Sequence, residues 1–236
     1  MSTDSLNLPY ELACSPTPPA VRPYLVADVS LVYDPRRPQV RLKRLMDASV
    51  ALLALIALIP CLAVIALAIK LSSSGPILFS QDRVAGGGKV FKLFKFRTMV
   101  PNAEAMKASL AAMNESDGPV FKIKRDPRVT AVGRFLRKHS LDELPQLWNV
   151  VVGDMSIVGP RPPVPEEVRR YRAEHLRRLS VPQGLTCIWQ VSGRSNISFE
   201  EWMRMDMAYI DSWSIRQDLS IILKTFKVVI QGSGAY

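Results

Sequence analysis

The chain has 236 residues, with 31 lysines and arginines against 21 aspartates and glutamates, a net charge of +10 and 48% hydrophobic residues. This length and apolar fraction suffice for one globular domain with appendages and exclude wholesale disorder. Three widely separated cysteines and two histidines indicate neither a disulfide framework nor a zinc site, and they leave little from which to build a Ser-His-Asp triad. Any catalysis is therefore expected to rest on carboxylates and cations.

The most informative segment is an uncharged apolar run of 22 residues from Ala48 to Ile69. A straight helix of this length would measure about 33 Å, close to the ~30 Å hydrocarbon core of a bilayer. Pro60 should kink this helix, because proline removes one backbone donor and clashes with the preceding turn. Residues 41–74 are therefore predicted to form a membrane helix with a break at Pro60.

From the residues alone, this segment could be a kinked spanning helix or a re-entrant hairpin whose two ends return to one face. Basic residues stand at both ends of the run, with Lys43 and Arg44 before it and Lys70 after it, so no one-sided flank fixes an orientation. A buried core helix is the third interpretation. A cleavable signal peptide is not expected, because the run begins about 47 residues into the chain.

The rest of the chain predicts an α+β domain over 75–236. Residues 1–40 hold seven of the 18 prolines and are predicted to be a loosely ordered cytosolic lead-in. Two strands at 77–84 and 90–99 flank a glycine-rich turn and predict a hairpin, and a short helix is expected at 103–113. Helices are further predicted at 131–139, 141–150, 165–179, 199–212 and 217–231. The last of these is amphipathic, as in a core helix or an interfacial helix.

Two adjacent carboxylates, Asp142 and Glu143, begin one of these helices. Ser140 and Glu143 have the spacing of a capping box, which is the structural interpretation of this motif. The functional interpretation places Asp142 in the first turn, where the helix dipole and free amides stabilise an anion. An ionised carboxylate in a fixed position suits nucleophilic attack on phosphorus, provided that cations neutralise the phosphoryl charge.

Candidate cations lie nearby in the sequence. Arg137 is within two helical turns of Asp142, and Arg161 stands between Pro160 and Pro162. Prolines on both sides fix the local backbone, so Arg161 could be presented for two-pronged phosphate binding. A solvated surface loop is the structural alternative for the Pro-Arg-Pro turn.

Further cations leave a rival function open. Lys95 and Arg97 alternate with apolar neighbours and share one strand face, which could also be a solvated face. Residues 121–138 carry seven lysines and arginines and one acid, so a polyanion or an anionic surface would be a natural partner. The rival is a non-enzymatic, membrane-anchored basic module that binds nucleic acid or anionic lipid. Against it, the sequence shows no nucleic-acid-binding motif.

Five motifs in order resemble the bacterial sugar transferases, or monotopic phosphoglycosyl transferases, over about residues 41–236. These motifs are Lys43–Asp47, Lys95–Met99, Arg137–Asn149, Gly153–Pro162 and Gln190–Arg194. Trp189–Arg194 and the terminal Gly234–Tyr236 look like the exopolysaccharide-initiating branch. Two departures are Ile59 before Pro60, where many members have serine, and Cys187 in place of a common glycine.

The resemblance implies an enzyme on the cytoplasmic face of the bacterial inner membrane, held by a re-entrant helix and amphipathic interfacial helices. It would move glucose or galactose 1-phosphate from a UDP-sugar to polyprenyl (undecaprenyl) phosphate. Asp142 would match the family's nucleophile, which forms an aspartyl phosphosugar, and Glu143 its paired acid near Mg²⁺. The other residues expected at the substrate are Arg161, Arg137, Lys95, Arg97, Pro160, Pro162 and Arg194. Membrane lipid is an expected partner, nucleic acid is not, and a homo-oligomer is allowed.

Overall fold

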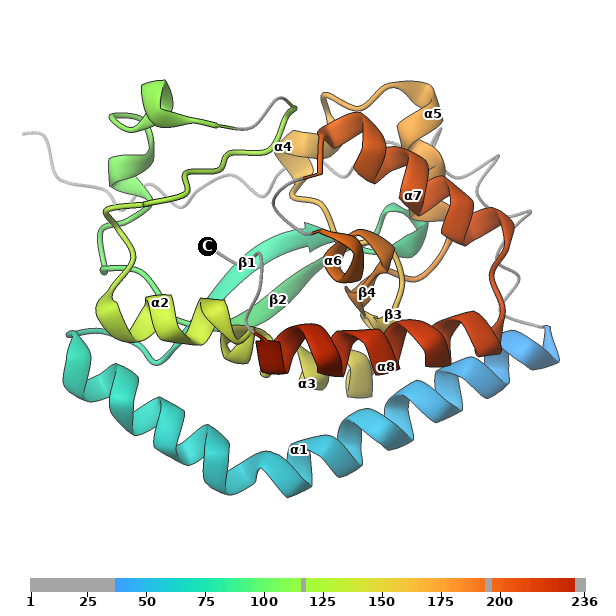
Figure 1. Cartoon of the computed structure of the whole chain (residues 1–236), viewed down its shortest axis with the longest axis horizontal. Coiled ribbons are helices and arrows are strands. Elements are labelled where there is room, and N and C mark those ends of the chain that lie inside the picture. Colours follow the sequence, from blue (N-terminus) through green and yellow to red (C-terminus); the bar gives the residue numbers. More distant parts are fainter. Residues whose placement is uncertain (1–36, 116–117, 194–196, 232–236) are drawn as a thin grey trace, which may run out of the picture.

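The computed structural model describes residues 37–115, 118–193 and 197–231. Almost all of the predicted lead-in over 1–40 therefore lies outside the described residues. Within them the protein combines one long helix, a β-hairpin, a second very short sheet and a set of shorter helices (Figure 1). The α+β class predicted from the sequence is confirmed.

The apolar run lies in one long helix, α1 (Pro38–Ser72), which by length and composition could cross a membrane. Pro60 is inside this helix, and Figure 1 shows α1 bent along its course, with both ends rising toward the rest of the molecule. A proline inside a helix is a common cause of such a bend, because it leaves a carbonyl of the preceding turn without its amide donor. The predicted break is thus a bend within one continuous helix.

One stripe of α1 is buried against the body of the protein in each half of the helix, on either side of the bend. Its buried residues recur at helical spacing: Val40, Lys43, Asp47, Ala51, Ile65 and Ile69. The large apolar side chains outside this stripe are exposed: Leu42, Leu45, Val50, Leu52, Leu53, Ile56, Ile59, Val64, Leu67 and Leu71. The interpretation as a buried core helix is therefore wrong, since a core helix would cover these side chains.

The predicted hairpin is confirmed as β1 (Leu78–Val84) and β2 (Val90–Phe96), which pair antiparallel with Phe79 opposite Lys95 and Arg83 opposite Phe91. A second sheet, not predicted, pairs β3 (Ser156–Val158) parallel with β4 (Gly184–Thr186). A Cβ atom on Gly184 would lie 2.1 Å from the amide nitrogen of Gly159, so the chains can approach this closely only at glycine. This close approach fixes the start of the loop that follows β3.

Most of the predicted helices occur near their predicted positions, as α2 (Ala131–Lys138), α3 (Gln146–Val152), α7 (Phe199–Asp211) and α8 (Ile215–Gln231). The helix predicted at 165–179 is instead divided into α4 (Pro165–Val168), α5 (Ala173–Leu176) and a 3-10 turn at Arg177–Ser180. The chain is extended at Arg172, which ends any continuous helix. A short α6 (Ile188–Ser192) completes the set.

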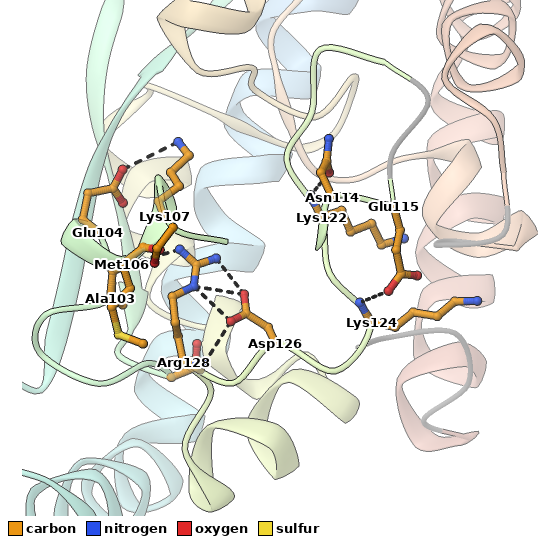
Figure 2. Close-up of polar contacts among 12 residues, drawn as sticks. Ala103, Glu104, Met106, Lys107, Asn114, Glu115, Lys122, Lys124, Asp126 and Arg128 are labelled. Carbon is orange, nitrogen blue, oxygen red and sulfur yellow. Dashed lines mark hydrogen bonds and ion pairs between the residues drawn. The ribbon is translucent and has the colours of Figure 1, made fainter. Parts of the chain in front are cut away.

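The segment between the hairpin and α2 is tied together by polar contacts rather than by a helix (Figure 2). The helix predicted at 103–113 is only two 3-10 turns, Ala105–Lys107 and Ala111–Met113. Arg128 binds both carboxylate oxygens of Asp126, with Nε–Oδ1 at 2.9 Å and Nη2–Oδ2 at 2.7 Å, and reaches the Ala103 carbonyl at 3.1 Å. Arg128, one of the cations in the basic run at 121–138, thus has a structural role in this segment.

The core lies between α1, the two sheets and α8. Ala51 of α1, Val150 of α3, Val158 of β3 and Ile221 of α8 belong to its main cluster, and Ile65 and Ile69 of α1 pack in a second cluster. Figure 1 shows α3 and α8 on the same side of the molecule as α1. Both helices also expose large apolar side chains: Trp148 and Val152 on α3, and Leu219, Leu223, Phe226 and Ile230 on α8.

A buried polar network fastens the first turns of α1. Lys43 Nζ lies 2.6 Å from Asp218 Oδ2 of α8, and the same carboxylate accepts hydrogen bonds from Tyr209 and Trp213. Asp47 accepts a 2.6 Å hydrogen bond from Ser156 of β3. Lys43 Nζ also lies 3.4 Å from Asp47 Oδ2, so this one buried cation compensates two buried carboxylates.

We expect Lys43→Met to destabilise the protein by about 3–5 kcal/mol, because it leaves the Asp218 carboxylate buried without its cation. The methionine keeps most of the apolar stem, so charge is the main change. The measurement is the thermal unfolding midpoint in one detergent. The control is Lys89→Met at the Lys89–Asp154 pair, whose lysine side chain is 72% exposed and whose loss should cost at most about 1 kcal/mol. Equal midpoints for the two variants would contradict the expectation.

Candidate active site

Three of the predicted site residues meet at one carboxylate oxygen. Lys95, near the end of β2, donates to Glu143 Oε1 at 2.8 Å, and Arg161 donates through Nη1 to the same oxygen at 3.1 Å. The side chains of Lys95 and Glu143 are only 16% and 15% exposed. A strand, a 3-10 turn and the loop after β3 therefore converge on Glu143.

Burial opposes ionisation of Glu143, but Lys95 and Arg161 outweigh it and hold the pKa of this carboxyl well below its usual range. Burial also lowers the pKa of the Lys95 ammonium, against the raising effect of Glu143. Glu143 is consequently an anion at neutral pH and organises the two cations beside it.

Asp142 differs from its neighbour in that its carboxylate is left free by the protein. Its side chain is buried, and none of the described residues donates a hydrogen bond to it or forms an ion pair with it. Burial raises the pKa of Asp142, and the charge of Glu143 adds to this, while Lys95, Arg137 and Arg161 pull the pKa down. A buried carboxylate with no partner, placed in a field of cations, has its oxygens available for chemistry.

The local backbone differs from the predicted helix start. Ser140 has a positive φ of 54° and makes no side-chain cap, and Leu141–Glu143 is a single 3-10 turn before α3. The capping box is therefore wrong, because the Glu143 carboxylate binds two cations in place of the amide of Ser140. The helix-dipole argument for Asp142 also fails, since a turn of three residues has no substantial dipole. The cations provide the positive field instead.

Arg137 and Arg97 have different positions relative to this cluster. Arg137 donates through Nε to Thr98 Oγ1 at 2.9 Å and lies close enough to lower the pKa of Asp142. The guanidinium of Arg97 instead binds the carbonyls of Ser73 and Ser74, at 2.8 Å and 2.6 Å, just beyond the end of α1. This differs from the expectation that Arg97 faces the substrate. The physical reason is that carbonyl groups at the C-terminal end of a helix have no amide donor within the helix, so a side chain can supply one.

Pro160 and Pro162 lie in the loop after β3, as expected for residues that fix Arg161, and both are buried. Arg194, the remaining predicted residue, lies outside the described residues. Arg83 was missed by the sequence analysis. It stands on the same face of the hairpin as Lys95, because Arg83 pairs with Phe91 and Lys95 with Phe79. This register is the signal that could have revealed it.

Arg83 brings another positive charge to the site. Its guanidinium donates through Nη1 to the Pro162 carbonyl at 2.9 Å, and none of the carboxylates in the described part of the chain forms an ion pair with it. Burial and the charge of Arg161 lower the pKa of Arg83 to about 10, so it remains a cation at neutral pH. Such a concentration of half-buried cations around so few carboxylates is suited to an anionic ligand.

The described residues contain no group of three or more His, Cys, Asp or Glu side chains that could hold a metal by themselves. Mg²⁺ is commonly bound by one or two carboxylates together with substrate phosphates and water. Asp142 has both oxygens free of described partners, and only Oε1 of Glu143 is bound by the described residues. These donors fit a Mg²⁺ ion that arrives with a diphosphate.

Comparison with known proteins identifies the family. Residues 38–232 match the family model for bacterial sugar transferases. The chain belongs to this family. The galactosyl transferase CpsE of Streptococcus agalactiae is 49% identical over 162 residues, which cover 68% of this chain and 36% of CpsE. The undecaprenyl-phosphate galactose phosphotransferase of Salmonella typhimurium is 45% identical over 169 residues, covering 69% of this chain and 35% of the relative.

A shorter relative matches over most of its length. The exopolysaccharide production protein ExoY of Sinorhizobium fredii is 42% identical over 199 residues, which cover 82% of this chain and 88% of ExoY. This chain thus spans about a third of the first two relatives and nearly the whole of ExoY. All five motifs lie within the family match over 38–232.

The depressed pKa of Glu143 predicts a pH-dependent contribution to stability. A carboxyl with a lowered pKa stabilises the folded state above its unfolded pKa of about 4.3, and this stabilisation is lost as pH falls toward the folded pKa. We therefore expect Glu143→Gln to lower stability by about 1–3 kcal/mol at pH 7 and by progressively less below about pH 4.3. Thermal unfolding midpoints of both proteins between pH 7 and pH 3 give the measurement. A constant difference across this range would contradict the expectation.

Proposed function

We propose that this protein transfers a sugar 1-phosphate from a UDP-sugar to undecaprenyl phosphate, through a covalent phosphosugar on Asp142. The observation that carries the proposal is the free, buried Asp142 carboxylate beside Glu143, Lys95 and Arg161. The names of the relatives, which describe sugar transfer and transfer to undecaprenyl phosphate, support this substrate class. Glucose or galactose 1-phosphate is the proposed group, and a role in exopolysaccharide assembly follows from the similarity to ExoY.

The reaction is proposed to proceed in two displacements. An Asp142 oxygen attacks the sugar-bearing phosphorus, a new O–P bond forms, and the bond to the nucleoside monophosphate breaks so that UMP leaves with its electron pair. A phosphate oxygen of undecaprenyl phosphate then attacks the acyl phosphate, which releases Asp142 as a carboxylate and gives a lipid diphosphate sugar. Two steps spare the enzyme from holding both anionic substrates together during attack.

The chain's own residues have distinct roles in this scheme. Glu143 holds Lys95 and Arg161 at the site, and their charges offset those of the phosphoryl oxygens. Asp142 must lose its proton before attack, so its raised pKa puts the acid limit of activity above that of an ordinary aspartate. Asp142 and Glu143 would hold Mg²⁺, which when bound would neutralise charge on the diphosphate oxygens.

We also propose that α1 is re-entrant and that the catalytic body sits on the cytoplasmic face of the inner membrane. Both ends of α1 contact the same body, through Lys43 with Asp218 at the start and through Arg97 with the Ser73 and Ser74 carbonyls at the end. A spanning helix would separate its ends by the ~30 Å hydrocarbon core. The exposed apolar side chains of α3 and α8 would then lie at the interface.

We expect the wild-type protein, given UDP-sugar and Mg²⁺ without lipid, to release UMP once and to gain one sugar-phosphate mass on Asp142. Asp142→Asn should abolish both the adduct and turnover, because the amide keeps the shape but loses the nucleophile. Intact-protein mass spectrometry and UMP release with a panel of UDP-sugars give the measurements. Asp211→Asn, at an exposed pair on α7, is the control and should behave as wild type.

Turnover by Asp142→Asn would rule out the covalent mechanism. Absence of UMP release with every sugar, together with salt-sensitive binding of nucleic acid, would favour the basic binding module instead.

Re-entrant topology predicts that both ends of α1 are labelled from the same side of the membrane. Arg41→Cys and Ser74→Cys, each in a background without Cys14, Cys61 and Cys187, should react with an impermeant thiol reagent in inside-out vesicles and not in intact spheroplasts. Lys89→Cys, on the exposed hairpin turn, reports the side of the catalytic body. Labelling of the two ends from opposite sides would establish a spanning helix.

A further inference from the structure

The backbone of the loop that presents Arg161 is held by hydrogen bonds to its carbonyl oxygens. Residues 160–163 read Pro-Arg-Pro-Pro, so three of the four lack an amide hydrogen and can be fixed by hydrogen bonds only at their oxygens. Each of the four carbonyls accepts a bond. The donors, in chain order, are Gly184 N at 2.8 Å, Arg178 Nη2 at 3.0 Å, Arg83 Nη1 at 2.9 Å and Val84 N at 2.9 Å.

Two of these donors are backbone amides of the sheets, but the middle two are arginine side chains. Arg178 binds the carbonyl of Arg161 itself, so its guanidinium sets the orientation of the residue that reaches Glu143. Arg83 binds the next carbonyl along, that of Pro162. The position of Arg161 therefore depends on a pair of guanidinium groups behind it.

Arg178 is built into the interior for this contact. It is fully buried, its Nη2 lies 2.7 Å from Asp206 Oδ2, and its Nη1 donates to the Tyr171 hydroxyl at 2.6 Å. The guanidinium also lies 4.9 Å from the centre of the Trp202 ring. A buried charge of this kind is costly unless it is paired, and Asp206 supplies the pairing. The planar guanidinium holds its donors on separate nitrogens in fixed directions, whereas a lysine has all its donors on one nitrogen.

We propose that Arg178, neutralised by Asp206, is a positioning residue for Arg161 and acts on the transfer reaction through the Arg161 carbonyl. The inference rests on the proposed function of Asp142 and Arg161. Arg178 touches neither Asp142 nor Glu143 through any bond of the described residues, and its influence passes through the loop backbone. A misplacement of about 1 Å at a catalytic group can lower the rate about 100-fold. Loss of the bonds that hold the Arg161 loop would therefore lower the rate of transfer.

The test is a double-mutant cycle between positions 178 and 161. Arg178→Lys keeps the charge beside Asp206 and loses the fork. In the wild-type background it should lower kcat about 10- to 100-fold for each molecule that folds. In the Arg161→Ala background the same change should lower kcat less than about 3-fold, because there is no guanidinium left to position. Equal losses in both backgrounds would overturn the proposal.

Two further measurements separate positioning from folding. The double substitution Arg178→Met with Asp206→Leu removes both charges, which buried pairs often tolerate without loss of stability. It should keep the thermal midpoint and still lose activity, whereas failure of both this variant and Arg178→Lys to fold would mark the pair as structural and overturn the assignment. Arg177→Lys, at the exposed Arg177–Asp211 pair, is the matched control and should leave kcat unchanged.

The wild-type adduct separates this proposal from the proposed function. If wild-type protein forms the phosphosugar on Asp142 and Arg178→Lys has wild-type kcat, only the positioning role fails. If wild-type protein forms no adduct and shows no turnover, the proposed function fails first, and the role of Arg178 in it falls as well.

Discussion

The site depends on one carboxylate oxygen, Glu143 Oε1, which accepts a bond from Lys95 on one strand and from Arg161 on a distant loop. Without this anion, the two partly buried cations would repel each other, and neither would be held in position. The adjacent Asp142, by contrast, has no hydrogen-bond or ion-pair partner among the described residues. Adjacent carboxylates thus differ in role because only one of them is used to hold the cations.

The geometry behind Glu143 comes from short elements with little regular structure of their own. The second sheet has two strands of three residues each, yet the contact between Gly159 and Gly184 and the bond from Gly184 to Pro160 fix where the Arg161 loop begins. Because prolines remove the amides from that loop, the protein holds it with arginine side chains that reach in from β1 and from the turn after α5. The position of this proline-rich loop therefore depends on guanidinium groups that bind its carbonyl oxygens.

The sequence predicted those parts of the molecule that show a recognisable pattern over many residues. The apolar run of α1 is recognised by its length and lack of charge, the hairpin by two strands that flank a glycine-rich turn, and α8 by its helical spacing of apolar residues. Strands as short as β3 carry no such signal, and the 3-10 turn at Asp142 was mistaken for a capped helix because Ser140 and Glu143 have the right spacing. Capping competes with salt bridges that only the fold reveals. The carbonyl partners of Arg97 and Arg83 likewise depend on the fold, although the hairpin register places Arg83 on the same face as Lys95.

The long apolar helix α1 and the site are linked through the end of β2 and the residue that follows it. Lys95 on β2 binds Glu143, and Arg97, which directly follows the last residue of β2, binds the carbonyls just beyond the end of α1. At the other end of α1, Asp47 is bonded to Ser156 of β3, the strand that leads into the Arg161 loop. Both halves of the bent helix are therefore bonded to segments that adjoin site residues. Under the proposed function this arrangement would set the depth of Lys95 and Arg161 relative to the bilayer, where a lipid-linked phosphate must arrive.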